Sequence, residues 1–476
     1  MTSVMQKIIS ILLTIISVIN GSFGVVNASA PDDAQGAWLL TDVVPFDGGY
    51  YSSALFNTGT GLDQEMPTIA QPEPDPTYSY MQLVRGTTLA DVEGYCEKLR
   101  NAGYDAVFEN QIENNYYYAY ENGDRLIYFF YNDASGETRI IDDCCNTAAL
   151  NEFSYTTDLS QIDGEPLQPT VYQFSYPYKD TAHPDTELYA DNGMLYVILL
   201  SDGKVILIDG GSKKQGSEQN IEEFWKFLHT ITGKKKNEKI DIAMWYGTHI
   251  HGDHNAFFYK LLRRHYKKIN LERVMFNFQA DEVIPTSAYG KRLRHIITNH
   301  YPDVQYIKDR SGYAFQLQDA LCEVIYTQED FVDAETASWV ATNPNDASSV
   351  LRITLGGKTF LFLGDSYYIV EDRLLQKYTA ETLHVDVLQA AHHLYNDLTQ
   401  LYPVIQPTYV MCPQSGLRAK TQPMAAYLTL REIVPAENFF FPNENIVYGF
   451  TPQSDGTITI SELAVDCGPY DGSTLN

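Results

Sequence analysis

The chain has 476 residues, and its 61 acidic and 33 basic side chains give a formal net charge of −28 at pH 7. This length favours more than one domain, and 44% hydrophobic with 20% charged residues is typical of a globular protein with a sizeable core. So much negative charge disfavours long nucleic acids as partners, because polyanions repel each other. One basic patch is interpreted as a solvated helix face; it comprises Arg263, Arg264, Lys267 and Lys268.

The first thirty residues have the features of a secretory signal peptide. Lys7 supplies a positive charge, an apolar run follows at residues 8–19, and Ala28-Ser29-Ala30 fits the small-x-small rule for cleavage. The run is short for a membrane-spanning helix, although an uncleaved anchor is the alternative interpretation. We therefore expect a secreted or cell-surface protein without a stable membrane span after cleavage. Six scattered cysteines without a CxxC pair predict no zinc ribbon or disulfide scaffold.

Residues 31–168 are predicted to form a small α+β domain of unknown role. The QPEPDPT stretch at residues 71–77 is typical of a linker. Thr88 is expected to cap a helix through Leu99, where apolar residues recur at helical spacing. Strands are predicted around that helix, at residues 80–84, 105–112, 115–121, 124–132 and 139–143.

Residues 169–476 are predicted to form a second, larger domain in which strands alternate with amphipathic helices. The alternation indicates either two sheets covered by helices or βαβ units. Helices are expected at about residues 217–232, 255–266, 288–300 and 369–378. Strands are expected at residues 195–200, 204–209, 239–247, 273–278, 322–327, 350–355, 358–364, 385–390 and 408–412.

Three of the eleven histidines of the chain lie in the short stretch THIHGDHN, residues 248–255. The stretch follows a predicted strand and precedes a helix expected from about residue 255, so its side chains are predicted to lie on the connecting loop. Imidazole and carboxylate together suit zinc and similar ions. In extended backbone the first two histidines face the same side, whereas the later pair can face a second metal position. The candidate ligands are His249, His251, Asp253 and His254.

Four further stretches support this motif in a fixed order along the chain. Asp209 ends the strand VILID, Asp365 follows the strand TFLFLG, and His392-His393 follow VDVLQAA. The segment NDASSVLRI, residues 345–353, precedes the Asp365 strand. With HIHGDH in the form HxHxDH, this set resembles the metallo-β-lactamase superfamily over about residues 169–465. The resemblance implies an α/β fold, an αββα two-sheet sandwich, preceded here by the small α+β domain.

The resemblance also implies roles for the motif residues. Two metal ions are expected, with zinc favoured over manganese or iron. Asp365 would bridge the ions, Asp209 would support the metal loop without binding metal, and Asp253 would also orient the attacking water. Either histidine of the pair can be the last ligand; similarity to the esterase branch favours His393, with His392 donating a proton to the leaving group. The expected ligands are then His249, His251, Asp253, His254, Asp365 and His393.

The pattern NDxSxV…GD…AHH is similar to the ComEC-type competence hydrolases and the teichoic-acid phosphorylcholine esterases. Like those branches, this sequence has no histidine between His300 and His384, where other members place a middle ligand. By resemblance the Asn/Ser segment lines the site, while the alternative is a loop that caps the next strand. Tyr395 stands near where the competence branch has Gly-Ser, and either offers its hydroxyl to the pocket or packs. The lining residues of the Asn/Ser segment are Asn345, Asp346 and Ser348.

These observations predict a secreted, metal-dependent hydrolase of phosphodiesters or phosphomonoesters, acting on a small-molecule or cell-wall substrate. One alternative is hydrolysis of another bond, in a lactone, thioester or β-lactam, because a fold does not fix a substrate. Another alternative is an inactive cell-surface protein whose Tyr-rich N-terminal domain binds glycan or wall polymer. Nucleic acid is a poorer fit to the acidic chain.

Overall fold

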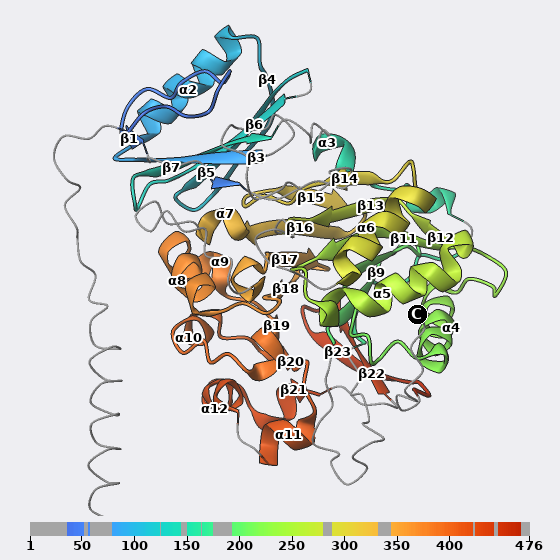
Figure 1. Cartoon of the computed structure of the whole chain (residues 1–476). Coiled ribbons are helices and arrows are strands. Elements are labelled where there is room, and N and C mark those ends of the chain that lie inside the picture. Colours follow the sequence, from blue (N-terminus) through green and yellow to red (C-terminus); the bar gives the residue numbers. More distant parts are fainter. Residues whose placement is uncertain are drawn as a thin grey trace, which may run out of the picture. The chain divides into compact units, whose positions relative to one another are not determined.

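The computed structural model describes residues 36–51, 56–57, 79–123, 125–143, 150–162, 164–174, 193–278, 288–331, 344–421, 424–441 and 446–467. The expected signal peptide and the QPEPDPT linker lie outside these residues. From Ala37 onward the chain belongs to one unit. Its described strands form three sheets, two of which face each other (Figure 1). No helix in the described ranges is long and apolar enough to cross a bilayer.

The first sheet is antiparallel and carries one long helix, α2 (Leu89–Asn101), on one face. Thr88 caps this helix as predicted: its hydroxyl accepts a hydrogen bond from the Asp91 amide, and the Asp91 carboxylate accepts one from the Thr88 amide. The strand order is β1-β3-β7-β6-β5-β4, with β2 beside β3. The strands are β1 (Tyr50–Tyr51), β2 (Phe56–Asn57), β3 (Ser79–Arg85), β4 (Asp105–Ile112), β5 (Asn115–Asn122), β6 (Arg125–Asn132) and β7 (Glu137–Asp143).

The other face of the first sheet packs onto the rest of the molecule. Tyr117, Tyr128 and Phe130 share one apolar cluster with Tyr313 and Phe315. The tyrosines that suggested a glycan-binding surface are therefore largely in the core; Tyr117, Tyr118, Tyr120, Tyr128 and Tyr131 are all buried.

The second sheet has the order β14-β13-β11-β10-β9-β8-β22-β23, with β12 beside β11. Its central pair, β10 and β11, is parallel, so both strands end at the same edge. The strands are β8 (Thr170–Gln173), β9 (Leu195–Leu199), β10 (Val205–Asp209), β11 (Ile240–Gly247), β12 (Ile269–Leu271), β13 (Arg273–Phe276), β14 (Gln305–Ile307), β22 (Ile446–Pro452) and β23 (Ile458–Ala464).

The third sheet has the order β15-β16-β17-β18-β19-β20-β21. Strands β18 and β19 are parallel neighbours, so they too end at one edge. The strands are β15 (Ala314–Leu317), β16 (Ala320–Tyr326), β17 (Val350–Leu355), β18 (Lys358–Phe362), β19 (Val387–Gln389), β20 (Tyr409–Met411) and β21 (Phe439–Phe440).

Helices cover the outer faces of the second and third sheets (Figure 1). Alternate residues of β9 show the layering: Ile198 packs in the cluster between the sheets, whereas Val197 packs against helices α4 and α5. Around the second sheet lie α4 (Glu218–Thr232), α5 (Gly252–His265) and α6 (Ala288–His300). Around the third lie α8 (Tyr368–Lys377), α9 (Ala380–Leu383), α10 (Leu401–Ile405), α11 (Gly416–Thr421) and α12 (Ala425–Arg431). The predicted αββα sandwich is confirmed.

Candidate metal centre

The candidate metal centre is built from residues that follow strands of the two facing sheets. Asp209 ends β10, and the HIHGDH stretch follows β11. Asp365 comes three residues after β18, and His392-His393 lie in the short helix η4 (Ala391–Leu394) after β19. Parallel strands that end at one edge bring these segments together.

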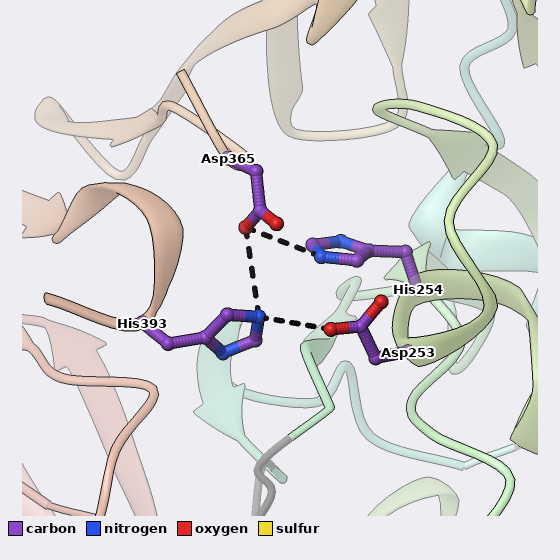
Figure 2. Close-up of side chains that lie close together, drawn as sticks. All are labelled: Asp253, His254, Asp365 and His393. Atoms are coloured by element: carbon purple, nitrogen blue, oxygen red, sulfur yellow. Dashed lines mark ion pairs between the residues drawn. The ribbon is translucent and has the colours of Figure 1, made fainter. Parts of the chain in front are cut away.

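Four side chains form the first ligand group, and Figure 2 shows them pointing toward one another. His254 Nε2 lies 3.2 Å from Asp365 Oδ1. His393 Nε2 lies 3.6 Å from the same oxygen and 3.3 Å from Asp253 Oδ2. The ligand atoms of this group all lie within 4.8 Å of one another.

A second ligand group contains His249, His251 and, again, Asp365. His249 Nε2 lies 3.0 Å from His251 Nδ1 and 3.6 Å from Asp365 Oδ2. Asp365 therefore turns one carboxylate oxygen toward each group, which is the arrangement of a carboxylate that bridges two ions. Among the described residues, the first group offers four protein ligands and the second offers three.

Buried polar atoms without hydrogen-bond partners test whether metal ions fit here. His254 Nε2, His393 Nε2 and Asp365 Oδ1 are buried, and within the described part of the chain they make no hydrogen bond. Each such atom costs about 1–3 kcal/mol if nothing satisfies it. Three of them converge in the first group, and a cation would satisfy all three together. The nitrogen and oxygen donors suit zinc, iron or manganese.

Hydrogen bonds from behind orient two of the imidazoles. His254 Nδ1 lies 2.7 Å from Asp209 Oδ2, and His393 Nδ1 lies 3.1 Å from the carbonyl oxygen of Pro413. A proton on Nδ1 in each ring leaves the Nε2 lone pair facing the centre, as metal-binding histidines require. The partners of these two rings thus fix the tautomer that can bind a cation.

Asp209 contacts the HIHGDH loop from the side away from the ligand groups. Its carboxylate accepts hydrogen bonds from the Thr248 amide, at 2.9 Å, and from the Thr248 hydroxyl. It is buried, and burial raises the pKa of Asp209 although its contact with His254 lowers it. Asp209 is a member of neither ligand group; it contacts Thr248 of the loop and the outer nitrogen of the ligand His254.

The carboxylates and imidazoles of the centre shift one another's pKa values. Although burial disfavours ionised groups, His254 and His393 hold the pKa of Asp365 well below its usual range. Burial likewise opposes the ionisation of Asp253, yet its contacts with His393 and His254 lower its pKa. Although burial disfavours a charged ring, Asp365 and Asp209 raise the pKa of His254. The carboxylates and the imidazole rings thus favour each other's charged forms, and a bound cation would take the place of the ring protons.

The turn that carries the histidine pair has an unusual backbone. His392, His393 and Leu394 have φ angles of 45°, 50° and 64°, in the left-handed region that non-glycine residues rarely adopt. Each such residue costs on the order of 1–3 kcal/mol, and strain of this kind clusters at functional sites. A hydrogen bond from the His392 amide to the Gly364 carbonyl, at 3.1 Å, ties the turn to the Asp365 loop.

The two histidines of the pair differ in burial and in neighbours. His393 is buried within the first ligand group, whereas the His392 side chain is 24% exposed and its Nε2 lies 3.8 Å from Asp365 Oδ2. The Asn345 amide lies 3.1 Å from His392 Nε2. Of the two, His393 has the position of a ligand and His392 that of a group facing the open side.

The other predicted lining residues differ in their contacts. Ser348 is buried, and its hydroxyl accepts a hydrogen bond from the Asp365 amide at 3.1 Å. Asp346 lies in η3 (Pro344–Ala347), where its backbone carbonyl accepts a hydrogen bond from Tyr326 and burial raises its pKa to about 6. Tyr395 is 46% exposed, with its ring centre 5.4 Å from that of His392.

One local expectation is wrong. The helix after the motif was expected from about residue 255, but α5 begins at Gly252. Asp253 and His254 therefore lie in its first turn rather than on the loop. Helical geometry turns them away from the extended His249-His251 segment, which is how neighbouring residues come to serve different ligand groups.

Two supporting residues escaped the sequence analysis. Asn255 donates to the carbonyl oxygens of His249 and His251, at 2.9 and 2.8 Å, and so fixes the loop. The Gln389 side chain makes two hydrogen bonds with the backbone of Gly364, next to Asp365. Their only sequence signal was position, since each is a polar residue beside a motif.

No family model matches the sequence, and neither does any curated protein. Similar solved structures include the metallo-β-lactamase-fold protein YhfI from Bacillus subtilis, with 12% identity and a TM-score of 0.36 over 59% of this chain and 99% of that one. CmlA, a diiron β-hydroxylase from Streptomyces venezuelae, has 13% identity and a TM-score of 0.34 over 61% of this chain and 55% of its own. A β-lactamase domain protein from Burkholderia ambifaria has 14% identity and a TM-score of 0.28 over 62% and 91%. Similarity this distant says nothing about the reaction. The metal site is therefore assigned from the positions of its own side chains.

Proposed function

We propose that this protein is a metal-dependent hydrolase of phosphoesters with a two-metal centre, most readily zinc. The observation that carries the proposal is the Asp365 carboxylate, which faces both ligand groups with one oxygen each. The ions would be held by His249, His251 and Asp365 on one side, and by Asp253, His254, Asp365 and His393 on the other. When bound, they supply Lewis-acid stabilisation of the attacked group and a more acidic attacking water.

The chain's own residues handle the water and the proton. The Asp253 side chain is 33% exposed, so it can accept a hydrogen bond from the attacking water and orient it. The His392 side chain is 24% exposed, and the Asn345 amide lies 3.1 Å from its Nε2, so the His392 ring can serve as the proton donor to the leaving oxygen.

Phosphoesters are favoured over acyl compounds on chemical grounds. Phosphoryl transfer spreads negative charge over several oxygens, and two adjacent cations stabilise that charge better than one. The similarity of the NDxSxV…GD…AHH pattern to phosphoesterase branches points the same way. Hydrolysis of a lactone, thioester or β-lactam is the second candidate, because the same centre can polarise a carbonyl. Secretion is proposed on the N-terminal sequence alone, with a small-molecule or cell-wall substrate.

The test compares Asp365→Ala with Asp372→Ala in zinc-loaded protein. Asp372 lies on the exposed side of α8, so its loss is a matched control. We expect Asp365→Ala to lower hydrolysis of bis(p-nitrophenyl) phosphate at least about a hundredfold and to lose bound zinc. Asp372→Ala should keep the wild-type hydrolysis rate and the wild-type zinc content. Full zinc content and an unchanged rate in Asp365→Ala would overturn the site. Turnover of a lactone or β-lactam without any phosphoester turnover would overturn the substrate class.

A further inference from the structure

A cavity of about 190 Å³ lies at the seam between the first sheet and the helices of the sandwich. One wall is formed by the ends of β6 and β7 with the turn between them, and the opposite wall by α8 and α7 (Gln328–Phe331). With about 30 Å³ for each water molecule, it has room for roughly six waters. Its described lining contains no member of either ligand group of the metal centre. The cavity is therefore a separate place where a small molecule or ion could bind.

Three cations line this cavity, and two of them have carboxylate partners. Arg139 Nη2 lies 2.6 Å from Glu137 Oε1, and Lys377 Nζ lies 2.7 Å from Asp330 Oδ1. Both of these cations are buried, and both of the carboxylates also line the cavity. The two pairs cancel in charge, so the third cation sets the net charge of the lining.

The third cation is Arg373, on α8. Its Nη1 donates to the side-chain oxygen of Gln376 at 3.0 Å, which is a contact with a neutral group. Its Nε is buried and makes no hydrogen bond within the described part of the chain. A buried N–H without an acceptor is unfavourable, and so is a charge without a partner. Among the described residues, Arg373 thus lacks both an acceptor for Nε and a carboxylate to balance its charge.

The positive charges around the cavity also disfavour one another. Burial lowers the pKa of Lys377, and Arg139 and Arg373 lower it as well, whereas Asp330 raises it. An anion placed among these cations would offset their repulsion. The rest of the chain carries a large excess of negative charge, with a formal net charge of −28, so a lining with one surplus cation is a local exception that attracts anions.

We propose that this cavity binds a small oxyanion, either a carboxylate or a phosphate, with Arg373 as its principal partner. Guanidinium pairs with both kinds of anion through two parallel N–H donors. The walls of the cavity belong to the first sheet and to α8, so a bound anion would contact both and hold them together. The inference goes beyond the proposed hydrolase and does not depend on it.

The opposing interpretation is that the cavity holds only water. Gln376→Glu distinguishes the two, because it puts a carboxylate where the Gln376 oxygen now accepts from Arg373. Arg373 then has a counter-charge within the chain, and the cavity has no surplus cation. The change is nearly isosteric and adds an ion pair at i,i+3 spacing, so the fold should persist. Gln219→Glu is the matched control: Gln219 is exposed on α4, where its amide donates to the Asp466 carbonyl.

Equilibrium dialysis of the full-length, zinc-loaded protein tests the inference without requiring turnover. The probes are radiolabelled inorganic phosphate and radiolabelled propionate, and the anions bound per chain are counted. A zinc centre can bind the same anions, so the measurement is the difference between proteins. We expect Arg373→Gln and Gln376→Glu each to bind one anion fewer per chain than the wild type, for at least one of the probes. The probe that shows the difference identifies the anion.

Two controls should bind as many anions as the wild type. They are Gln219→Glu and Arg264→Gln, which make the same changes of charge on exposed parts of α4 and α5. An unchanged count for both probes in Arg373→Gln or in Gln376→Glu would overturn the inference. The same loss in either control would also overturn it, because net charge would then explain the data. Zinc content is measured in every protein, and a loss of zinc together with the anion would place that anion at the metal centre instead.

Discussion

Two buried polar clusters in this molecule look alike in composition but differ in how their groups are paired. In the metal centre, His254 Nε2, His393 Nε2 and Asp365 Oδ1 make no hydrogen bond within the described chain. In the second cluster Arg310, 1% exposed, donates to Asp143 of β7 at 2.5 Å and to Glu329. Lys377 pairs there with Asp330 at 2.7 Å. We call this second cluster the Arg310 network.

We infer from this difference that the Arg310 network stabilises the fold, whereas the metal centre binds a ligand. The Arg310 network joins the first sheet to the two-sheet sandwich, and its ion pairs are complete without any further molecule. A buried ion pair with both partners present is tolerated, and loss of one partner leaves a costly lone charge. The metal centre instead brings together two ring nitrogens and a carboxylate oxygen that make no hydrogen bond within the described chain, and one cation would satisfy them together. We therefore expect substitutions in the Arg310 network to lower the free energy of unfolding, and substitutions in the metal centre to lower the affinity for metal.

The largest expected effect on stability is that of Arg310→Met. Removing the guanidinium takes a buried cationic partner from both Asp143 and Glu329, so we expect the free energy of unfolding to fall by about 3–5 kcal/mol. Urea unfolding measures this. Arg264→Met is the control, because Arg264 is 53% exposed and pairs with Glu218 and Glu222 at the surface. It should cost less than about 1 kcal/mol. Equal losses of unfolding free energy in Arg310→Met and Arg264→Met would contradict a special structural role for the Arg310 network.

A smaller effect is expected from Asp209→Asn, and it should appear in metal binding. The change weakens the hold on the ligand His254 and on Thr248, which precedes the ligand His249, so zinc affinity should fall by about 10–100-fold. Competition with a chromogenic chelator measures the affinity. Asp319→Asn, which alters a contact with Ser201, is the control and should bind zinc as the wild type does. Unchanged affinity in Asp209→Asn would mean that the loop needs no carboxylate behind it.

The smallest effect is expected from Asn345→Ala, and it should depend on the leaving group. Without the amide, the His392 ring loses the side chain that contacts its Nε2 and orients it. We expect phosphodiesters with an alkyl leaving group to be hydrolysed about tenfold more slowly, and p-nitrophenyl esters less than about twofold, since a good leaving group needs little proton donation. An equal loss on both substrates would indicate a structural role for Asn345.

The strands around the centre could be predicted because they are continuous apolar runs. VILID and IDIAMWYG are buried on both faces, and such runs stand out against the polar loops. The three strands at one end of the second sheet, β8, β22 and β23, were not predicted. Strand β22 pairs with β8, although residues 446–452 and 170–173 lie far apart in the sequence. No local pattern encodes such a pairing.

The candidate ligands at residues 249–254 could be named from sequence because histidine and aspartate are so dense there, whereas Asp365 and His393 were named through the family resemblance. The start of α5 was misplaced because Gly252, Asp253 and His254 are poor helix formers and add no apolar periodicity. The Arg310 network could not be predicted at all. Asp143, Arg310 and Glu329 each look like ordinary surface charges, and only the packing of the first sheet onto the sandwich brings them together.

Zinc stoichiometry tests the central claim most directly. Wild-type protein and Asp365→Asn would be loaded with zinc, freed of excess ion and measured by mass spectrometry of the metal per chain. The account predicts two ions per wild-type chain and less than one in Asp365→Asn, because the shared carboxylate contributes to both ligand groups. Two ions in both proteins, or none in the wild type, would contradict a centre bridged by Asp365.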